Sequence, residues 1–145
     1  NGTALHRILA DLRLLPLRQQ AVDALAQRKQ STANDLLPRL LQARHLVEAR
    51  FLDDLRVADV ATAVSLSEFH FARLFKAAFG ESLYQFIKRL RLDEARYRLL
   101  ADRVSVTELG LQVGYSSLSS FIHAFRGRFG LSPAQYRDQL QNEQE

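Results

Sequence analysis

Several residue types that support particular chemistries are missing from this sequence. It has no cysteine, which excludes disulfide bonds and any site that depends on a thiolate. It has no methionine either, so we interpret the chain as a fragment of a longer protein. No apolar run approaches the roughly 20 residues of a membrane span, and the first residues do not form a signal peptide. We therefore expect a cytoplasmic protein without a membrane partner.

The motifs of common catalytic sites are also missing. The sequence contains no glycine-rich phosphate loop and no Gly-x-Ser-x-Gly turn. Its histidines, His6, His45, His70 and His123, lack the spacing of metal ligands, and we expect His45 at the surface and His70 packed against a helix. We therefore expect no enzymatic activity, no metal and no cofactor. The net charge of +4 permits a polyanionic partner without requiring one.

What is present is the pattern of an all-α protein. The chain has only 3 prolines and 6 glycines, and its apolar residues recur every three or four positions, which is the helical period. One such stripe covers 5–15, and the polar stretch 30–35 indicates a linker or turn. We expect 1–35 to be a helical remnant or linker from an upstream regulatory or dimerisation domain, and 36–140 to form the main domain.

Within the main domain the pattern predicts a series of helices. The first ends near 52–54, and others follow at 57–64, 67–79, 83–100, 106–113, 118–129 and from 133 onward. Ser67 suits the N-cap of the helix that ends at Phe79. Gly80 suits a left-handed residue after that helix, and Pro133 suits the first turn of the last one.

Two segments of the chain repeat each other. Each contains a short helix, a tight turn and a longer helix, which is the layout of a helix-turn-helix. The small residues Ala61 and Gly110 allow the first helix of each repeat to approach the second closely. The repeated pairs lie 50 positions apart: Phe71 and Phe121, Phe75 and Phe125, Phe79 and Phe129, and Gly80 and Gly130.

The longer helix of each repeat has an outward face that ends in a cation. These faces carry Phe69, Ala72, Arg73 and Lys76 in the first repeat, and Ser119, Ile122, His123 and Arg126 in the second. Such a helix fits the major groove of DNA, where its first residues reach base edges and its cations reach phosphates. Plain helical packing units show the same periodicity, so both interpretations stand at this point.

Taken jointly, the motifs resemble those of the AraC/XylS family of bacterial transcription regulators, from about residue 40 to residue 137. The first repeat resembles the family's first helix-turn-helix, and 86–95 resembles its connecting helix. One departure is Ser65, which stands where the family has a turn glycine. The second repeat carries the most specific matches: Gly114-Tyr115-Ser116-Ser117, Phe125-Arg126, Arg128-Phe129-Gly130, Ser132-Pro133 and Tyr136-Arg137.

The resemblance implies an AraC-type DNA-binding domain over 36–140, built from two homeodomain-like helix-turn-helix subdomains (57–79 and 106–129) joined by a long connecting helix (83–100). It implies a sequence-specific transcription regulator, an activator in most members, that inserts two recognition helices into adjacent major-groove segments. The implied partners are double-stranded DNA, RNA polymerase and a second copy bound through the upstream domain. The alternative is a protein-interaction module that uses the surface of Phe69, Leu118 and Ile122.

The outward faces supply the candidate contacts. We expect base contacts from Phe69, Ala72, Arg73, Leu118, Ser119, Ile122 and His123, and phosphate contacts from Ser67, Lys76, Ser117, Arg126 and Arg128.

Arg73 is the strongest of these candidates because its fork pairs with O6 and N7 of guanine; the alternatives are a phosphate or an ion pair with Glu68. Phe69 suits a thymine methyl group or a sugar, and the alternative is packing against a neighbouring helix. On the connecting helix, the basic run of Lys88, Arg89 and Arg91 is typical of a solvated face. The alternative for Arg91 is a structural pairing with an acid inside the domain, and we expect Arg96 and Arg98 to be solvated.

Overall fold

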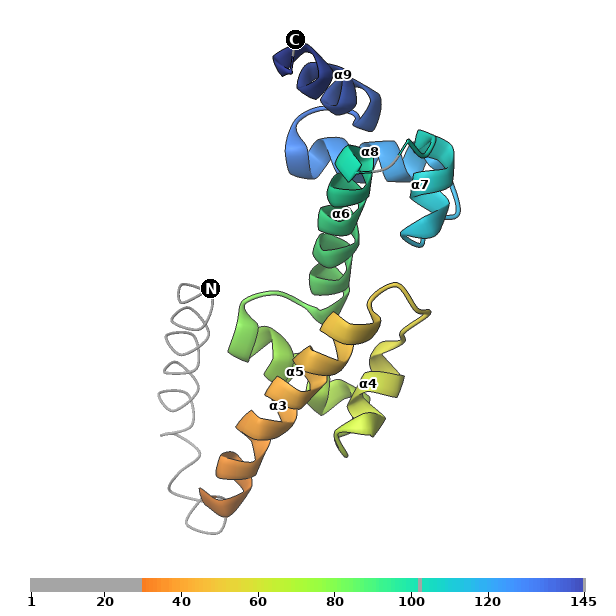
Figure 1. Ribbon diagram of the computed structural model, residues 1–145. Coiled ribbons are helices and arrows are strands. Elements are labelled where there is room, and N and C mark those ends of the chain that lie inside the picture. The colour runs from red at the N-terminus through yellow and green to blue at the C-terminus, as the bar shows by residue number, and fades with distance from the viewer. Residues whose placement is uncertain (1–29, 102, 145) are drawn as a thin grey trace. The chain divides into compact units, whose positions relative to one another are not determined.

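The computed structural model of the chain describes residues 30–101 and 103–144, and these residues form helices joined by turns (Figure 1). The expectations for 1–29 lie outside the described residues. The described part contains no strand, and the predicted all-α class is confirmed. The helices are α3 (Gln30–Arg50), α4 (Val57–Ala63), α5 (Glu68–Phe79), α6 (Leu83–Ala101), α7 (Val106–Gln112), α8 (Leu118–Phe129) and α9 (Pro133–Glu143).

These helices belong to two compact units. Of the described residues, the N-terminal unit contains 30–50 and 55–86, and the C-terminal unit contains 51–54, 87–101 and 103–144. Helix α6 begins in the N-terminal unit and continues in the C-terminal one. Each unit therefore holds one of the two repeats, α4 and α5 in the first and α7 and α8 in the second.

The prediction of a linker or turn at 30–35 is wrong, because these residues form the start of α3. Serine, threonine, asparagine and aspartate cost at most about 0.7 kcal/mol each relative to alanine inside a helix, so a polar stretch does not exclude one. Pro38, whose missing N–H removes one helical hydrogen bond, also lies inside α3. The helix ends at Arg50, slightly before the predicted end near 52–54.

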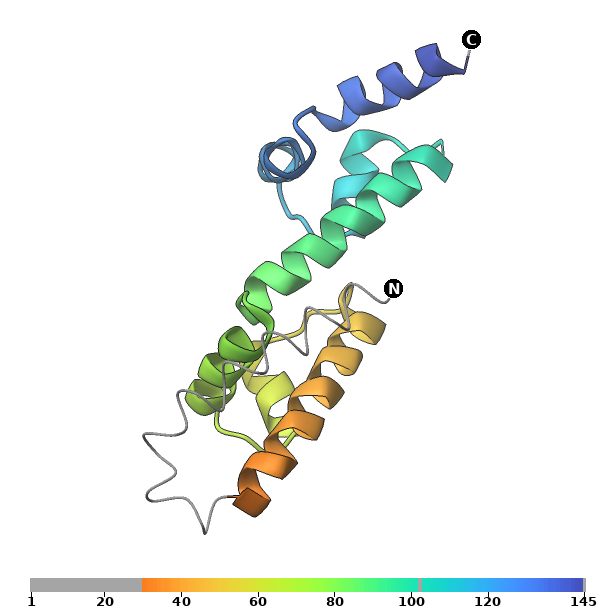
Figure 2. The same cartoon turned by 90° about the vertical axis from the view of Figure 1, so that its left-hand side faces the viewer.

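In the N-terminal unit, α3, α4 and α5 pack around a core of aliphatic and phenylalanine side chains. Helix α3 lies beside α4 in both views of the chain (Figures 1 and 2). The rings of Phe71 and Phe75 are fully buried and lie 5.6 Å apart, as the inward stripe of α5 predicted. The other buried apolar residues of this unit are Leu40, Ala43, Val47, Val60, Ala61, Val64, Ala78, Leu83 and Phe86.

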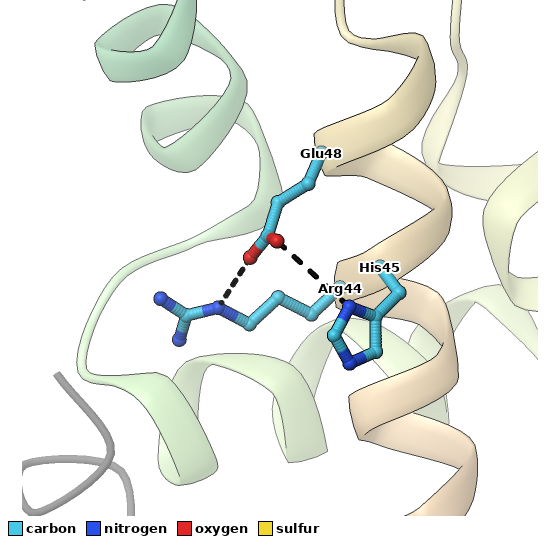
Figure 3. Close-up of polar contacts among 3 residues, drawn as sticks. All are labelled: Arg44, His45 and Glu48. Atoms are coloured by element: carbon cyan, nitrogen blue, oxygen red, sulfur yellow. Dashed lines mark hydrogen bonds and ion pairs between the residues drawn. The ribbon is translucent and has the colours of Figure 1, made fainter. Parts of the chain in front are cut away.

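Arg44 closes the edge of this core. Its guanidinium carbon lies 4.9 Å from the ring centre of Phe79 and 5.0 Å from that of Phe86, and its Nε donates to Glu48 at 3.1 Å (Figure 3). His45 lies at the surface, as expected, with Nδ1 3.9 Å from the other carboxylate oxygen of Glu48. Arg44 thus connects α3 to α5 and to the first turns of α6 through the faces of two rings.

The C-terminal unit repeats this plan around α7 and α8. Leu92, Ala95 and Leu99 of α6 pack against Phe121 and Phe125 of α8. Gly110 of α7 faces the Phe121 ring so closely that an added Cβ would lie 3.0 Å from it. The close approach of α7 to α8 therefore depends on the small residue, as the sequence suggested.

The turn inside each repeat has a residue with positive φ. Ser65 has φ 59° and Gly114 has φ 95°. In each turn the next amide donates to the short helix, from Leu66 to the Ala61 carbonyl at 3.0 Å and from Tyr115 to the Gly110 carbonyl at 2.9 Å. The two turns thus use the same hydrogen bond, but the first makes it with a serine in a conformation that favours glycine.

Candidate nucleic-acid interface

The start of α5 is fixed by a side-chain cap. Ser67 is the N-cap, and its Oγ accepts a hydrogen bond from the His70 amide at 3.2 Å. The other end stops at Gly80, whose φ of 77° is the left-handed conformation that the sequence predicted. Because both ends are defined, α5 presents a fixed set of outward residues beyond the core of its unit.

The outward face of α5 is open to solvent. Phe69, Ala72, Arg73 and Lys76 are all exposed, and the ring of Phe69 is 73% exposed. No helix of the described residues therefore covers Phe69. The guanidinium carbon of Arg73 lies 5.5 Å from the centre of the Phe69 ring. Arg73 thus lies against an aromatic ring of its own helix. The sequence had also allowed an ion pair between Arg73 and Glu68.

Helix α8 begins with the same type of cap. The Oγ of Ser117 accepts from the Ser120 amide at 3.2 Å and lies 3.3 Å from the Oγ of Ser119. After this cap along α8, Leu118 is 42% exposed and Ile122 is half-buried. The other candidate base contacts of α8, Ser119 and His123, are exposed, as is Arg126.

Arg128, near the end of α8, is already paired with an acid. Its Nε and one terminal nitrogen donate to the two carboxylate oxygens of Asp93 on α6, at 2.8 and 3.0 Å. Arg128 and Arg96 also lie near the ring of Phe129, at 5.4 and 4.9 Å from its centre. A phosphate contact by Arg128 remains a prediction, and its ion pair leaves Lys76 and Arg126 as the stronger candidates.

Two arginines of α6 have partners that the sequence did not reveal. Arg91 donates to the backbone carbonyls of Phe51 at 2.7 Å and Asp53 at 2.9 Å. Its role is therefore structural and not that of a solvated side chain, but its partners are carbonyls where the alternative had expected an acid. Arg98, expected to be solvated, donates to Glu94 at 3.0 Å and to Gln112 at 3.2 Å. The Glu94–Arg98 pair could have been found from its spacing of four on one helix. Carbonyl acceptors and partners on another helix, by contrast, have no sequence signal.

The histidines and acids of the described residues form no group that could hold a metal ion. His70, which we expected to pack against a helix, is exposed, because it lies between the inward face and the Phe69–Arg73 side of α5. Within the described residues no helix is long and apolar enough to span a membrane.

A family model described as a helix-turn-helix domain matches residues 60–139 of the chain. Two curated relatives are the Msm operon regulatory protein of Streptococcus mutans, 29% identical over 70% of this chain, and the xylose operon regulatory protein of Escherichia coli, 29% identical over 92% of it. The chain spans only 36% and 35% of the lengths of these relatives.

Solved structures share the fold. A transcriptional regulator from Chromobacterium violaceum, described as containing an AraC-type DNA-binding domain, is 33% identical with a TM-score of 0.66, over 71% of this chain and 92% of that one. The DNA-binding domain of AdpA, solved in complex with a target DNA, has a TM-score of 0.67 at 24% identity, over 72% of this chain and 94% of its own. At that identity the second likeness concerns the fold alone.

Proposed function

Because the chain belongs to the AraC/XylS family of helix-turn-helix DNA-binding regulators, we propose that it binds specific DNA sequences through α5 and α8 and thereby controls transcription. The observation that carries this proposal is the pair of matching outward faces. Each begins at a serine-capped helix start, Ser67 or Ser117, and exposes a cation further along, Lys76 or Arg126. A capped helix with this face is suited to the major groove.

The two faces differ in what they offer to DNA. The face of α5 carries an arginine fork and a phenylalanine ring, which suit a guanine edge and a thymine methyl group. The face of α8 carries Leu118, Ser119, Ile122 and His123, which suit methyl groups and single hydrogen bonds. Lys76 and Arg126 suit phosphates, which position a protein on the duplex without reading its sequence.

The wider role of the protein is part of the same proposal. The main domain begins with α3, somewhat before the expected boundary at 36, and extends to about residue 140. The segment that precedes α3 belongs to an upstream domain that forms a homodimer. The two helices read adjacent major-groove segments about one helical turn apart. The protein acts in the cytoplasm as an activator that contacts RNA polymerase beside the promoter. The relatives support this as regulators of operons, which is what their names state.

Salt dependence separates this proposal from the alternative of a protein-interaction module. Lysine and arginine that contact phosphates release condensed counterions, so the affinity of the chain for duplex DNA should fall linearly on a plot of log K against log salt. An interface built on Phe69, Leu118 and Ile122 would be nearly insensitive to salt. The measurement is a fluorescence anisotropy titration of labelled random-sequence duplex at several salt concentrations, and a flat plot would contradict the proposal.

Two substitutions on one face should then have different effects. Lys76→Ala removes a phosphate contact, so it should lower the affinity for all duplexes alike. It should also reduce the slope of log K against log salt by about 1. Arg73→Ala should cost about 1–3 kcal/mol of discrimination at one base position. The matched control is Lys88→Ala, which removes one exposed charge of the same kind from α6, and the slope it gives should stay close to that of the unsubstituted chain. Equal loss of base preference from Arg73→Ala and Lys76→Ala would contradict these roles.

A further inference from the structure

The start of α5 holds an aromatic ring and a guanidinium in contact. Phe69 is the second residue of the helix, and Arg73 follows one turn later. The guanidinium carbon lies 5.5 Å from the ring centre, within the range of a cation–π interaction. The ring, 73% exposed, contributes little to the core of the N-terminal unit. The chain thus places an exposed aromatic side chain against the arginine of the outward face.

We propose that Phe69 and Arg73 act as one reading unit that recognises a thymine next to a guanine in the major groove. This inference rests on the proposed function, because it requires α5 to lie in the groove. The Arg73 fork donates to O6 and N7 of the guanine, while the edge of the Phe69 ring covers the 5-methyl group of the thymine. Phe69 is therefore a positioning residue for Arg73 as well as a contact.

The geometry favours a joint role. A cation held against a ring by a cation–π contact, as at 5.5 Å here, uses no hydrogen bond for that contact, so its N–H groups stay available to a base. An arginine that is held in place before binding also loses less conformational freedom when it binds. Neighbouring base pairs are about 3.4 Å apart along the duplex, so a ring and a guanidinium in contact can reach adjacent bases.

The second repeat cannot form this unit. The positions equivalent to Phe69 and Arg73, 50 residues later, are Ser119 and His123. The residue one turn before His123 in α8 is therefore a serine and not an aromatic residue. The adjacent thymine and guanine belong to the half of the operator that α5 reads, and the α8 half has no such requirement.

The test uses duplexes that the whole chain selects from a random library. In the α5 half of the best site, the thymine is replaced by deoxyuridine, which lacks only the methyl group, and the guanine by 7-deazaguanine, which lacks N7. The first change should weaken binding about four-fold, the effect expected for one buried methyl group. The second should weaken it roughly ten-fold, within the range of one bidentate base contact. Selected sites without adjacent thymine and guanine would overturn the inference.

Variants of Phe69 then separate methyl contact from positioning. Phe69→Trp keeps a ring, so deoxyuridine and 7-deazaguanine should each still weaken binding as they do with the unsubstituted chain. Phe69→Leu keeps apolar surface without a ring, so it should retain the deoxyuridine effect and lose most of the 7-deazaguanine effect. Phe69→Ala should lose both. The control is Tyr84→Ala, which removes a ring that is 72% exposed in the same unit and should change neither effect.

The outcomes distinguish this inference from the proposed function. If Phe69→Ala leaves the preference for guanine over 7-deazaguanine unchanged, Phe69 does not position Arg73 and the inference is overturned, while specific DNA binding stands. If the unsubstituted chain selects no sequence at all, the proposed function fails first. Phe69 is exposed, so circular dichroism of each variant should match that of the unsubstituted chain.

Discussion

The surroundings of Gly114 leave no room for a Cβ. Its φ is 95°, and an added Cβ would lie 2.6 Å from a terminal nitrogen of Arg91. That guanidinium is held by the carbonyls of Phe51 and Asp53. Gly114→Ala should therefore strain the backbone and also displace Arg91, at a total cost of about 2–4 kcal/mol in the free energy of unfolding.

Gly130 provides the matched control for that substitution. Its φ is 82°, and an added Cβ would meet nothing within 4 Å. Gly130→Ala should therefore show the backbone cost alone, about 1–2 kcal/mol. Urea denaturation of both variants measures the difference, and equal losses would contradict a role of Arg91 as a clamp on the segment 51–54.

Ser65 offers the opposite substitution. It holds φ 59° in the turn where the second repeat has Gly114. Ser65→Gly relieves the left-handed strain of a residue with a Cβ, although the unfolded chain gains freedom, so we expect the free energy of unfolding to rise by about 0.5–1 kcal/mol. Thermal denaturation should show an increase in Tm, and a decrease would mean that the serine side chain stabilises this turn in another way.

At the scale of the helix, α8 contains an interior glycine with no structural requirement. Gly127 lies in the last turns of α8, and an added Cβ would meet nothing within 4 Å. Gly127→Ala should stabilise the protein by about 1 kcal/mol, because alanine loses less backbone entropy in a helix. Such a gain corresponds to a Tm increase of roughly 4–8 °C for a small domain. An unchanged Tm would show that the end of α8 is frayed in solution.

Most helix positions could be predicted from the sequence because local rules determine them. The apolar period placed α4 to α8, and the ends followed from Ser67, Gly80 and Pro133, whose effects act within a few residues. The prediction of a turn at 30–35 was wrong because it rested on the polarity of these residues, and polarity does not determine backbone conformation. The ends of a helix can thus be predicted where a residue type has a strong backbone preference, and they cannot where it has none.

The side-chain partners could not be predicted in the same way. Arg91 contacts the carbonyls of Phe51 and Asp53, and Arg128 contacts Asp93, across 35 to 40 positions of sequence. Nothing in an isolated arginine distinguishes a partner of this kind from a DNA phosphate, so both were candidates for other roles. Exposure of the outward faces was predictable, because the buried phenylalanines fix which side of α5 and α8 points outward.

At the scale of the whole molecule, we propose that α5 and α8 read one DNA site together. The most direct test is selection of bound duplexes from a random library at moderate salt, followed by sequencing. We expect two short enriched motifs about one helical turn apart, roughly 10 base pairs, with thymine next to guanine in only one of them. Absence of any enriched sequence, together with binding that salt does not weaken, would contradict it.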